Sequence, residues 1–324
     1  MAVNIEQTIV ATLWDQTDEV ADEVTRNNAL LRYIESNGEI RRKNLGYEIR
    51  KPVMYNDTAV GGFYSGYSSF NLDAVDDLTA FVFAIKQCYE PVAISGREKR
   101  ANQGDMQLID LAETKIKAAR ARLKNTVNTS LNGLGTGFGG LEFDGIRKAV
   151  STTPTTGTYG GQSRTTEVYA RNYAVTATCT AANIQETITD AISQTVRGEE
   201  SADLGLQDNT NWKLLHSSLT AIQRITSSTD KLKAGGRSLM YDGVEFVLGG
   251  GWGGPSSVSS GLETNSCRLL QTKYWSFDLQ SGADFKPLAP TMARPVDQDA
   301  FFTVIIVEGN LCCSAPALQV VIAP

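Results

Sequence analysis

Histidine is almost absent from this chain of 324 residues, in which His216 is the only one. A single histidine excludes a metal site with several histidine ligands and makes a histidine-based catalytic triad hard to build. His216 follows Leu215 in a segment with helical periodicity. That position favours a structural or surface role over a catalytic one.

Cysteines are few and show no pairing pattern. The chain has five, an odd number, and none form a C-x-x-C pair: Cys88, Cys179, Cys267, Cys312 and Cys313. This pattern excludes a disulfide framework and a zinc site. We expect isolated buried thiols, made in a reducing cytoplasm, and no disulfide between the neighbours Cys312 and Cys313.

Long apolar runs and an excess of positive charge are also missing. The longest apolar run, Ala300 to Val307, is far too short to cross a bilayer. The N-terminus has no basic start followed by an apolar stretch, so no secretory signal is expected. A net charge of -6 argues against a dedicated nucleic-acid-binding protein, whose domains are usually strongly basic.

The composition that remains is that of a folded protein. Hydrophobic residues make up 41% of the chain, which is ordinary for a globular protein and enough for a substantial core. The 29 glycines, together with frequent threonine, serine and asparagine, favour strands and loops with only a few long helices. We therefore expect an α+β fold.

The most informative segment is a polar, aromatic and glycine-rich excursion from Leu45 to Asn71. It predicts a projecting hairpin with strands over Gly46–Pro52 and Phe63–Phe70. An isolated hairpin is marginal in water, so this one needs a surface on a neighbouring copy. Aromatic residues are enriched at protein interfaces, and the expected contact residues are Tyr55, Phe63, Tyr64, Tyr67 and Phe70. A sugar-binding platform is the alternative interpretation of these aromatics.

An alternating apolar segment, Leu78 to Ser95, in which a strand is expected over Thr79–Tyr89, then leads into an amphipathic pattern from Gly96 to Leu131. Ser95 and Glu98 have the spacing of a capping box. We predict one helix on the order of 45 Å long. Its packing stripe includes Ile109, Ile116, Leu123 and Val127. The opposite face, Lys115 to Lys124, is basic and is expected to contact acids of a neighbouring subunit or to be solvated.

The rest of the chain alternates strands, helices and loops. We predict helical stretches in Glu6–Asn37, Asn183–Arg197 and Trp212–Ser227, a strand over Tyr173–Cys179, and strand structure within Cys267–Asp278. Asp242-Gly243, inside Leu239–Val247, predicts a tight hairpin turn. Ala300–Ile322 is interpreted as two strands that turn at Gly309-Asn310. Irregular loops, exposed or central in an assembly, are expected at Ser151–Thr166 and at Gly249–Gly261, which contains Trp252.

No combination of residues forms a convincing active site. Gly135–Gly140 matches G-x-G-x-x-G, but a helix precedes it where a dinucleotide site needs a strand, so a flexible turn is expected. Asp73, Asp76 and Asp77 lack the spacing of an EF-hand. They are interpreted as a solvated bend or as an electrostatic contact for a neighbouring subunit, with cation binding as a minor alternative. We expect a structural protein, not an enzyme, with no cofactor and no metal.

Several segments resemble a known family in their order and spacing. They are Ser95–Gly104 (SGREKRANQG) with Ile109-Asp110-Leu111, Phe143–Lys148 (FDGIRK), Tyr159–Arg164 (YGGQSR), Met240–Val247 (MYDGVEFV) and Leu270–Trp275 (LQTKYW). The chain resembles the major capsid proteins of tailed bacteriophages, which have the HK97 fold. Those proteins often carry tryptophan where this chain has Tyr169 and Tyr173.

The resemblance implies a domain plan. An N-terminal arm would cover residues 1–44 and an extended hairpin, the E-loop, residues 45–77. A peripheral domain with a long spine helix would combine residues 78–131 and 285–324. An axial domain would cover residues 132–284, with Trp252 on one of its loops.

The resemblance also implies a function and partners. Copies would self-assemble into pentamers and hexamers of an icosahedral head around double-stranded DNA, bound without sequence specificity, in a virion assembled in the host cytoplasm. A separate scaffolding protein, a portal protein and a possible cement protein are expected, and no membrane. The stretch Pro52 to Ile85 has no lysine, which argues against autocatalytic crosslinking. The alternatives are an encapsulin-like compartment and a β-rich glycan-binding virion protein.

Overall fold

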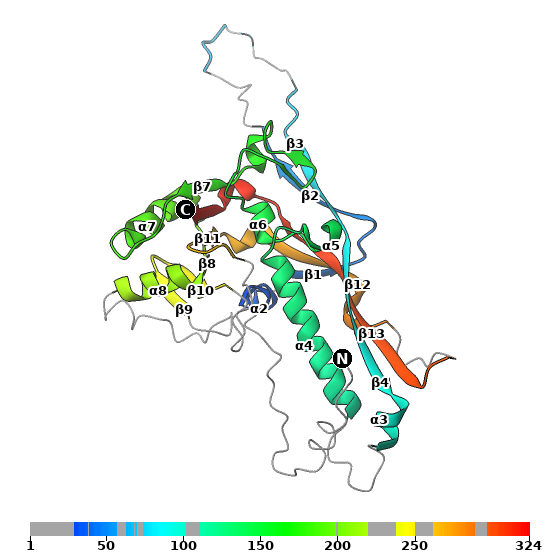
Figure 1. Cartoon of the computed structure of the whole chain (residues 1–324). Helices are drawn as coiled ribbons and strands as arrows, with labels where there is room; N and C mark the ends of the chain where they lie inside the picture. The colour runs from blue at the N-terminus through cyan, green and yellow to red at the C-terminus, as the bar shows by residue number, and fades with distance from the viewer. Residues whose placement is uncertain are drawn as a thin grey trace.

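The computed structural model describes residues 29–37, 39–56, 63–67, 69, 74–101, 111–198, 200–219, 238–249, 262–288 and 297–324. They form two larger sheets, each with its own helices, and a small sheet from which a loop projects (Figure 1). Helix α2, Ala29–Ser36, is the described part of the helical stretches expected over Glu6–Asn37. Most of the expected N-terminal arm, residues 1–28, lies outside the described residues.

The first sheet has the strand order β1-β12-β13-β4 and lies beside the long helix α4, Leu111–Leu131. Its strands are β1 (Ile40–Lys43), β12 (Trp275–Pro287), β13 (Ala300–Cys313) and β4 (Lys86–Ser95). Leu123 and Val127 of α4 are fully buried against this sheet, and Ile116 is half-buried, as the packing stripe predicts. Ile109 lies outside the described residues.

The predicted single helix from Gly96 to Leu131 is wrong. The structure has a short helix α3, Gly96–Ala101, and then α4. Lys115 Nζ lies 2.8 Å from the Glu98 carboxylate. In one straight helix those residues would be about 25 Å apart, so α3 cannot continue α4. The capping box is confirmed, because Ser95 N–H donates to Glu98 Oε2 at 2.9 Å and Glu98 N–H donates to Ser95 Oγ at 3.1 Å.

The predicted turn at Gly309-Asn310 is also wrong. Strand β13 runs through both residues and pairs with β12 on one side and β4 on the other. A Cβ on Gly309 would lie 2.1 Å from the backbone oxygen of Asp278, so the glycine permits close approach of two strands. The chain turns later, through the 3-10 helix η3, Pro316–Leu318.

The second sheet has six strands in the order β7-β14-β11-β8-β10-β9. They are β7 (Tyr173–Thr176), β14 (Val320–Ala323), β11 (Cys267–Leu270), β8 (Leu204–Gln207), β10 (Val244–Leu248) and β9 (Ser238–Tyr241). Helices α7, Ile184–Thr195, and α8, Asn209–Ser218, share a second buried core with it. The predicted strand at Tyr173 and helix at Asn183 are confirmed. Helix α8 starts before the predicted Trp212, because Asp208 caps it, and ends at Ser218 instead of Ser227.

The Asp242-Gly243 hairpin is confirmed. β9 and β10 are antiparallel, and the two turn residues have φ angles of 50° and 78°. Positive φ at both central positions is the requirement of a tight primed turn.

The expected domain boundary between residues 284 and 285 does not follow the sheets. All of β12 lies in the first sheet, although most of it precedes residue 285. Strand β14 lies in the second sheet, although it follows that residue.

The first strand predicted for the projecting hairpin, Gly46–Pro52, overlaps an observed strand, but its partner is not the predicted one. β2, Glu48–Met54, pairs with β3, Leu78–Ala84, and residues 63–67 form no strand. Strand β3 is held because Phe81 and Phe83 are buried, whereas Phe63 and Tyr67 are fully exposed and have nothing to pack on. The loop between the strands therefore spans residues 55–77, which we call the projecting loop.

Candidate assembly surfaces

The root of the projecting loop rests on an aromatic cluster. Phe81 and Phe83 of β3 contact the buried ring of Tyr159 at centroid distances of 5.8 and 5.3 Å. Tyr169, in the 3-10 helix η1 (Val168–Ala170), lies 5.8 Å from Phe81 and 5.4 Å from Tyr55. Tyr55, the first residue of the loop, is therefore partly covered by its own chain.

The segment Ser151–Thr166, expected as an irregular and exposed or central loop, contains a short hairpin that supports β3. The hairpin strands are β5, Thr158–Tyr159, and β6, Gln162–Ser163. Val82 N–H donates to Gly160 O at 2.9 Å, and a Cβ on Gly160 would lie 2.7 Å from that of Phe81. The segment is rich in threonine and glycine, and this composition gave no indication that its tyrosine, Tyr159, would be buried.

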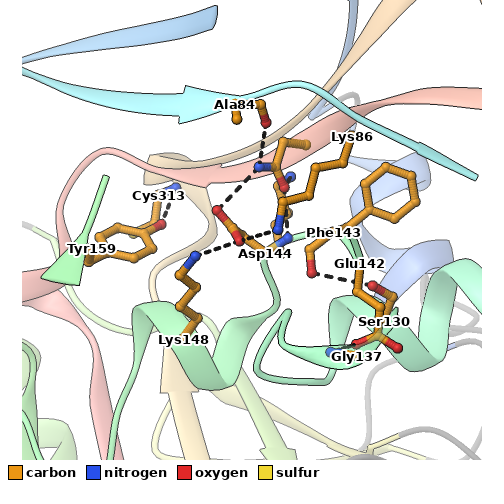
Figure 2. Close-up of polar contacts among 12 residues, drawn as sticks. Ala84, Lys86, Ser130, Gly137, Glu142, Phe143, Asp144, Lys148, Tyr159 and Cys313 are labelled. Atoms are coloured by element: carbon orange, nitrogen blue, oxygen red, sulfur yellow. Dashed lines mark hydrogen bonds and ion pairs between the residues drawn. The ribbon is translucent and has the colours of Figure 1, made fainter. Parts of the chain in front are cut away.

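A buried polar network joins β3 and β4 to the rest of the body (Figure 2). Asp144 accepts hydrogen bonds from Lys86 Nζ at 2.9 Å and from Lys148 Nζ at 2.7 Å. Its backbone N–H donates to Asn310 Oδ1 at 2.8 Å. Asn310 Nδ2 donates to the backbone oxygen of Ala84, the last residue of β3, at 3.0 Å. We call Lys86, Asp144, Lys148 and Asn310 the Asp144 network.

The Asp144 network links segments that are far apart in sequence. Lys86 begins β4, Asn310 lies inside β13, and Lys148 lies in helix α6, Ile146–Ala149. Asp144 and Asn310 are buried and the Lys86 side chain is 13% exposed, so each of these needs its partner, whereas Lys148 is partly exposed. The network thus fixes the direction in which β3, and with it the projecting loop, leaves the body. Sequence reasoning missed it because Asn310 was assigned to a turn.

Tyr159 connects the aromatic cluster to the same region. Its hydroxyl accepts a hydrogen bond from the Cys313 N–H at 2.9 Å. Burial raises the pKa of Tyr159 well above its ordinary 10.0, and the nearby thiols of Cys313 and Cys312 add to this rise. Burial also raises the pKa of the Cys313 thiol to about 12, so this sulfur stays protonated and inert. All five cysteines are free, as expected, and Cys88 is only half-buried.

Beyond Tyr55, the described aromatics of the projecting loop are exposed on their own subunit. Phe63 and Tyr67 have relative exposures of 113% and 106%, and Tyr64 has 66%. Large exposed aromatics of this kind mark interaction surfaces. Two other expected contact residues, Phe70 and Trp252, lie outside the described residues.

The basic face of α4 divides into paired and unpaired cations. Lys115 pairs with Glu98, and Arg122 Nε lies 2.6 Å from Glu90. Arg120 and Lys124 have no acidic partner among the described residues and line a separate cleft.

An ion cluster joins strand β11 of the second sheet to helix α6. Glu263 accepts hydrogen bonds from Arg268, which is fully buried, and from Arg147 Nη2 at 2.7 Å. Burial alone would raise the pKa of Glu263, but the charges and hydrogen bonds of Arg268 and Arg147 outweigh it and hold that pKa below its usual 4.5. The cluster is therefore structural and depends on an ionised carboxylate.

The described residues contain no cluster suited to metal chemistry. In that part of the chain, nowhere do three or more histidine, cysteine or acidic side chains gather as a cation site would need. His216 stacks on Trp212 within α8, with ring centroids 5.3 Å apart, in the structural role expected. None of the described helices combines the length and the apolar character that a membrane crossing needs.

Comparison with solved structures identifies the fold. The chain aligns with the capsid of cyanophage A-1(L) over 96% of both chains, at 13% identity and a TM-score of 0.67. It aligns with the capsid of a native GTA particle over 100% of both chains, at 11% identity and a TM-score of 0.65. The chain has the HK97-like fold.

The same fold also occurs in an encapsulin. The holo-SrpI encapsulin complex from Synechococcus elongatus PCC 7942 matches over 100% of this chain and 96% of its own, at 10% identity and a TM-score of 0.58. No protein-family model and no curated protein sequence matches the chain significantly. The fold predicted from short sequence segments is thus confirmed by structure alone.

Proposed function

We propose that this chain is the major capsid protein of a tailed phage, a structural protein that self-assembles into an icosahedral shell around double-stranded DNA. The observation that carries this proposal is the end-to-end alignment with capsid subunits at TM-scores of 0.67 and 0.65. Assembly takes place in the host cytoplasm and the product is the virion.

We assign the two expected domains to the two larger sheets, with bounds that differ from the expected ones. The sheet β1-β12-β13-β4 with α4 as its spine helix is the peripheral domain. The six-stranded sheet with α7 and α8 is the axial domain. The β2–β3 sheet and the projecting loop are the E-loop.

The projecting loop acts by covering a neighbour. Phe63 and Tyr67 are fully exposed on an isolated subunit, and burial of each aromatic on another copy would remove a large apolar surface from water. Because Pro52 to Ile85 contains no lysine, the contact is noncovalent. A separate scaffolding protein and a portal protein complete the particle, and the shell is stabilised by noncovalent contacts or by a cement protein.

The proposal is tested by expressing the chain with its genomic neighbours and separating the product on a sucrose gradient. Large particles that protect double-stranded DNA from nuclease support a phage head. Large particles filled with a single protein cargo would favour the encapsulin-like alternative, for which the Synechococcus structure gives a precedent in fold. Small oligomers that bind glycans would contradict both.

A further inference from the structure

A cleft between α2, β1, α4 and β12 carries more positive than negative charge. Its volume is about 340 Å³. The cations that line it are Arg42, Arg120 and Lys124, the acids are Glu35 and Asp284, and the apolar walls are Leu31, Ile40 and Phe285. We call it the basic cleft.

The cations of the basic cleft are not all neutralised. Arg42 pairs with Asp284. Arg120 and Lys124 are one helical turn apart on α4, and no carboxylate of the described residues pairs with either. Lys124 lies over the ring of Phe285, 6.0 Å from its centroid, which directs the ammonium group along the cleft wall. Like charges with this spacing repel each other, so an acidic partner would be favourable here.

The same chain offers a segment of opposite charge. Between Pro52 and Ile85 it has four aspartates, Asp57, Asp73, Asp76 and Asp77, and no lysine or arginine. Asp76 and Asp77 are exposed where the projecting loop meets β3, and neither carboxylate has an ion pair among the described residues. Their backbone oxygens are fixed, because Asn56 Nδ2 donates to Asp76 O at 3.2 Å and Tyr55 N–H donates to Asp77 O at 3.1 Å. The two carboxylates are therefore presented from an ordered root.

Within one subunit, Asp76 and Asp77 do not lie at the basic cleft. The loop leaves the end of the β2–β3 sheet that points away from α2 and α4 (Figure 1). A second copy is thus the source of the complementary charge.

We propose that Asp76 and Asp77 of one copy bind Arg120 and Lys124 in the basic cleft of a neighbouring copy. The proposal rests on the proposed function, since it names the contact by which the projecting loop holds two shell subunits together. Charge complementarity at an interface gives orientation and register more than affinity. The contact would therefore select the correct neighbour while the exposed aromatics supply apolar burial.

The test uses charge reversal and charge exchange in the full chain. A cleft variant carries Arg120→Glu and Lys124→Glu, a loop variant carries Asp76→Lys and Asp77→Lys, and an exchanged variant carries all of these. The matched control carries Lys213→Glu and Asp190→Lys, exposed positions on α8 and α7. Shell yield is measured by sedimentation and electron microscopy, and folding of each subunit by circular dichroism.

We expect the cleft and loop variants to fold but lose shells, the exchanged variant to regain them, and the control to match the wild type. Normal shells from either reversed variant, or a folded exchanged variant that stays defective, would overturn the contact. A cleft variant whose shells form normally but hold less DNA would also overturn the contact, because that result would mean that the basic cleft binds nucleic acid.

Failure of the proposed function is a distinct result. Wild-type subunits that never form shells would contradict that function. The contact is then decided by analytical ultracentrifugation of the subunits, in which small oligomers should be lost on charge reversal and regained on exchange. Oligomers unaffected by reversal would overturn it.

Discussion

At the scale of single residues, one buried carboxylate joins segments from distant parts of the chain. Asp144 accepts from Lys86 and Lys148, and its backbone binds Asn310. A buried charge pair adds little net stability over an apolar replacement, but removing one member leaves the other charge without compensation. The Asp144 network therefore specifies geometry, and its members are not interchangeable.

The first prediction concerns that carboxylate. Asp144→Ala should lower the free energy of unfolding by about 3 kcal/mol, because it leaves the nearly buried ammonium group of Lys86 without its anion and removes the partner of the partly exposed Lys148. Urea denaturation measures the change. Asp190→Ala, an exposed acid on α7, is the matched control and should shift it by less than about 0.5 kcal/mol. Equal shifts for both variants would show that the network has no such role.

The second prediction concerns pH. Burial opposes ionisation of Glu263, but Arg268 and Arg147 together hold its pKa in the folded chain below the usual 4.5. A depressed pKa means that the ionised form stabilises the fold above pH 4.5 and that this stabilisation is lost as pH falls through the folded value.

Glu263→Gln should therefore destabilise the chain at pH 7 and differ less from the wild type at pH 3. Urea denaturation at both pH values measures the two differences. A difference in the free energy of unfolding between wild type and variant that stays constant, or grows, at low pH would contradict the direction of the Glu263 pKa shift.

At the scale of elements, glycines that permit close approach have a larger effect than glycines in open space. A Cβ at Gly309 would lie 2.1 Å from the Asp278 backbone oxygen in the neighbouring strand, whereas one at Gly46 would meet nothing within 4 Å. We predict that Gly309→Ala lowers the free energy of unfolding by about 3 kcal/mol, because β12 and β13 must separate. Gly46→Ala should be close to neutral by the same urea assay. A neutral Gly309→Ala would contradict the strand approach.

Local signals were the part of the fold that the sequence could predict. The Asp242-Gly243 turn and the Ser95 capping box depend on a few adjacent residues, and both are confirmed. Gly309 was misinterpreted because a glycine needed for strand approach and a glycine needed for a turn look alike in one sequence. The reversal between α3 and α4 was missed because it depends on packing against β4.

The candidate assembly surfaces were likewise predictable only where they depend on local sequence. The exposure of Phe63 and Tyr67 follows from their polar, glycine-rich surroundings and was anticipated. The strand that pairs with β2 was not, because Phe81 and Phe83 are held by Tyr159, which is distant in sequence. Contacts of that kind follow from the assembled fold and not from local pattern.

The projecting loop gives a prediction at the scale of this element. Phe63→Ser with Tyr67→Ser should leave the free energy of unfolding unchanged, since both rings are fully exposed on the subunit, but should abolish shells. Chemical denaturation and sedimentation measure the two properties. Tyr173→Ser, at a partly exposed tyrosine of β7 away from the loop, is the control and should retain assembly. A normal yield of shells from the double variant would show that Phe63 and Tyr67 are not needed for the contact between subunits.

At the scale of the whole molecule, the proposed function accounts for both the folded parts and the exposed ones. One core is shared by the two larger sheets, and a second lies between the six-stranded sheet and the helices α7 and α8. The projecting loop and the basic cleft have groups that the described part of the subunit does not satisfy. The alignments with the cyanophage and GTA capsids extend over nearly the full chain and show that the fold is shared.

Electron microscopy of the purified protein, expressed with its genomic neighbours, tests this account most directly. The account predicts closed particles with icosahedral symmetry, built from pentamers and hexamers of this chain. Small discrete oligomers, formed even with a scaffolding candidate present, would contradict it.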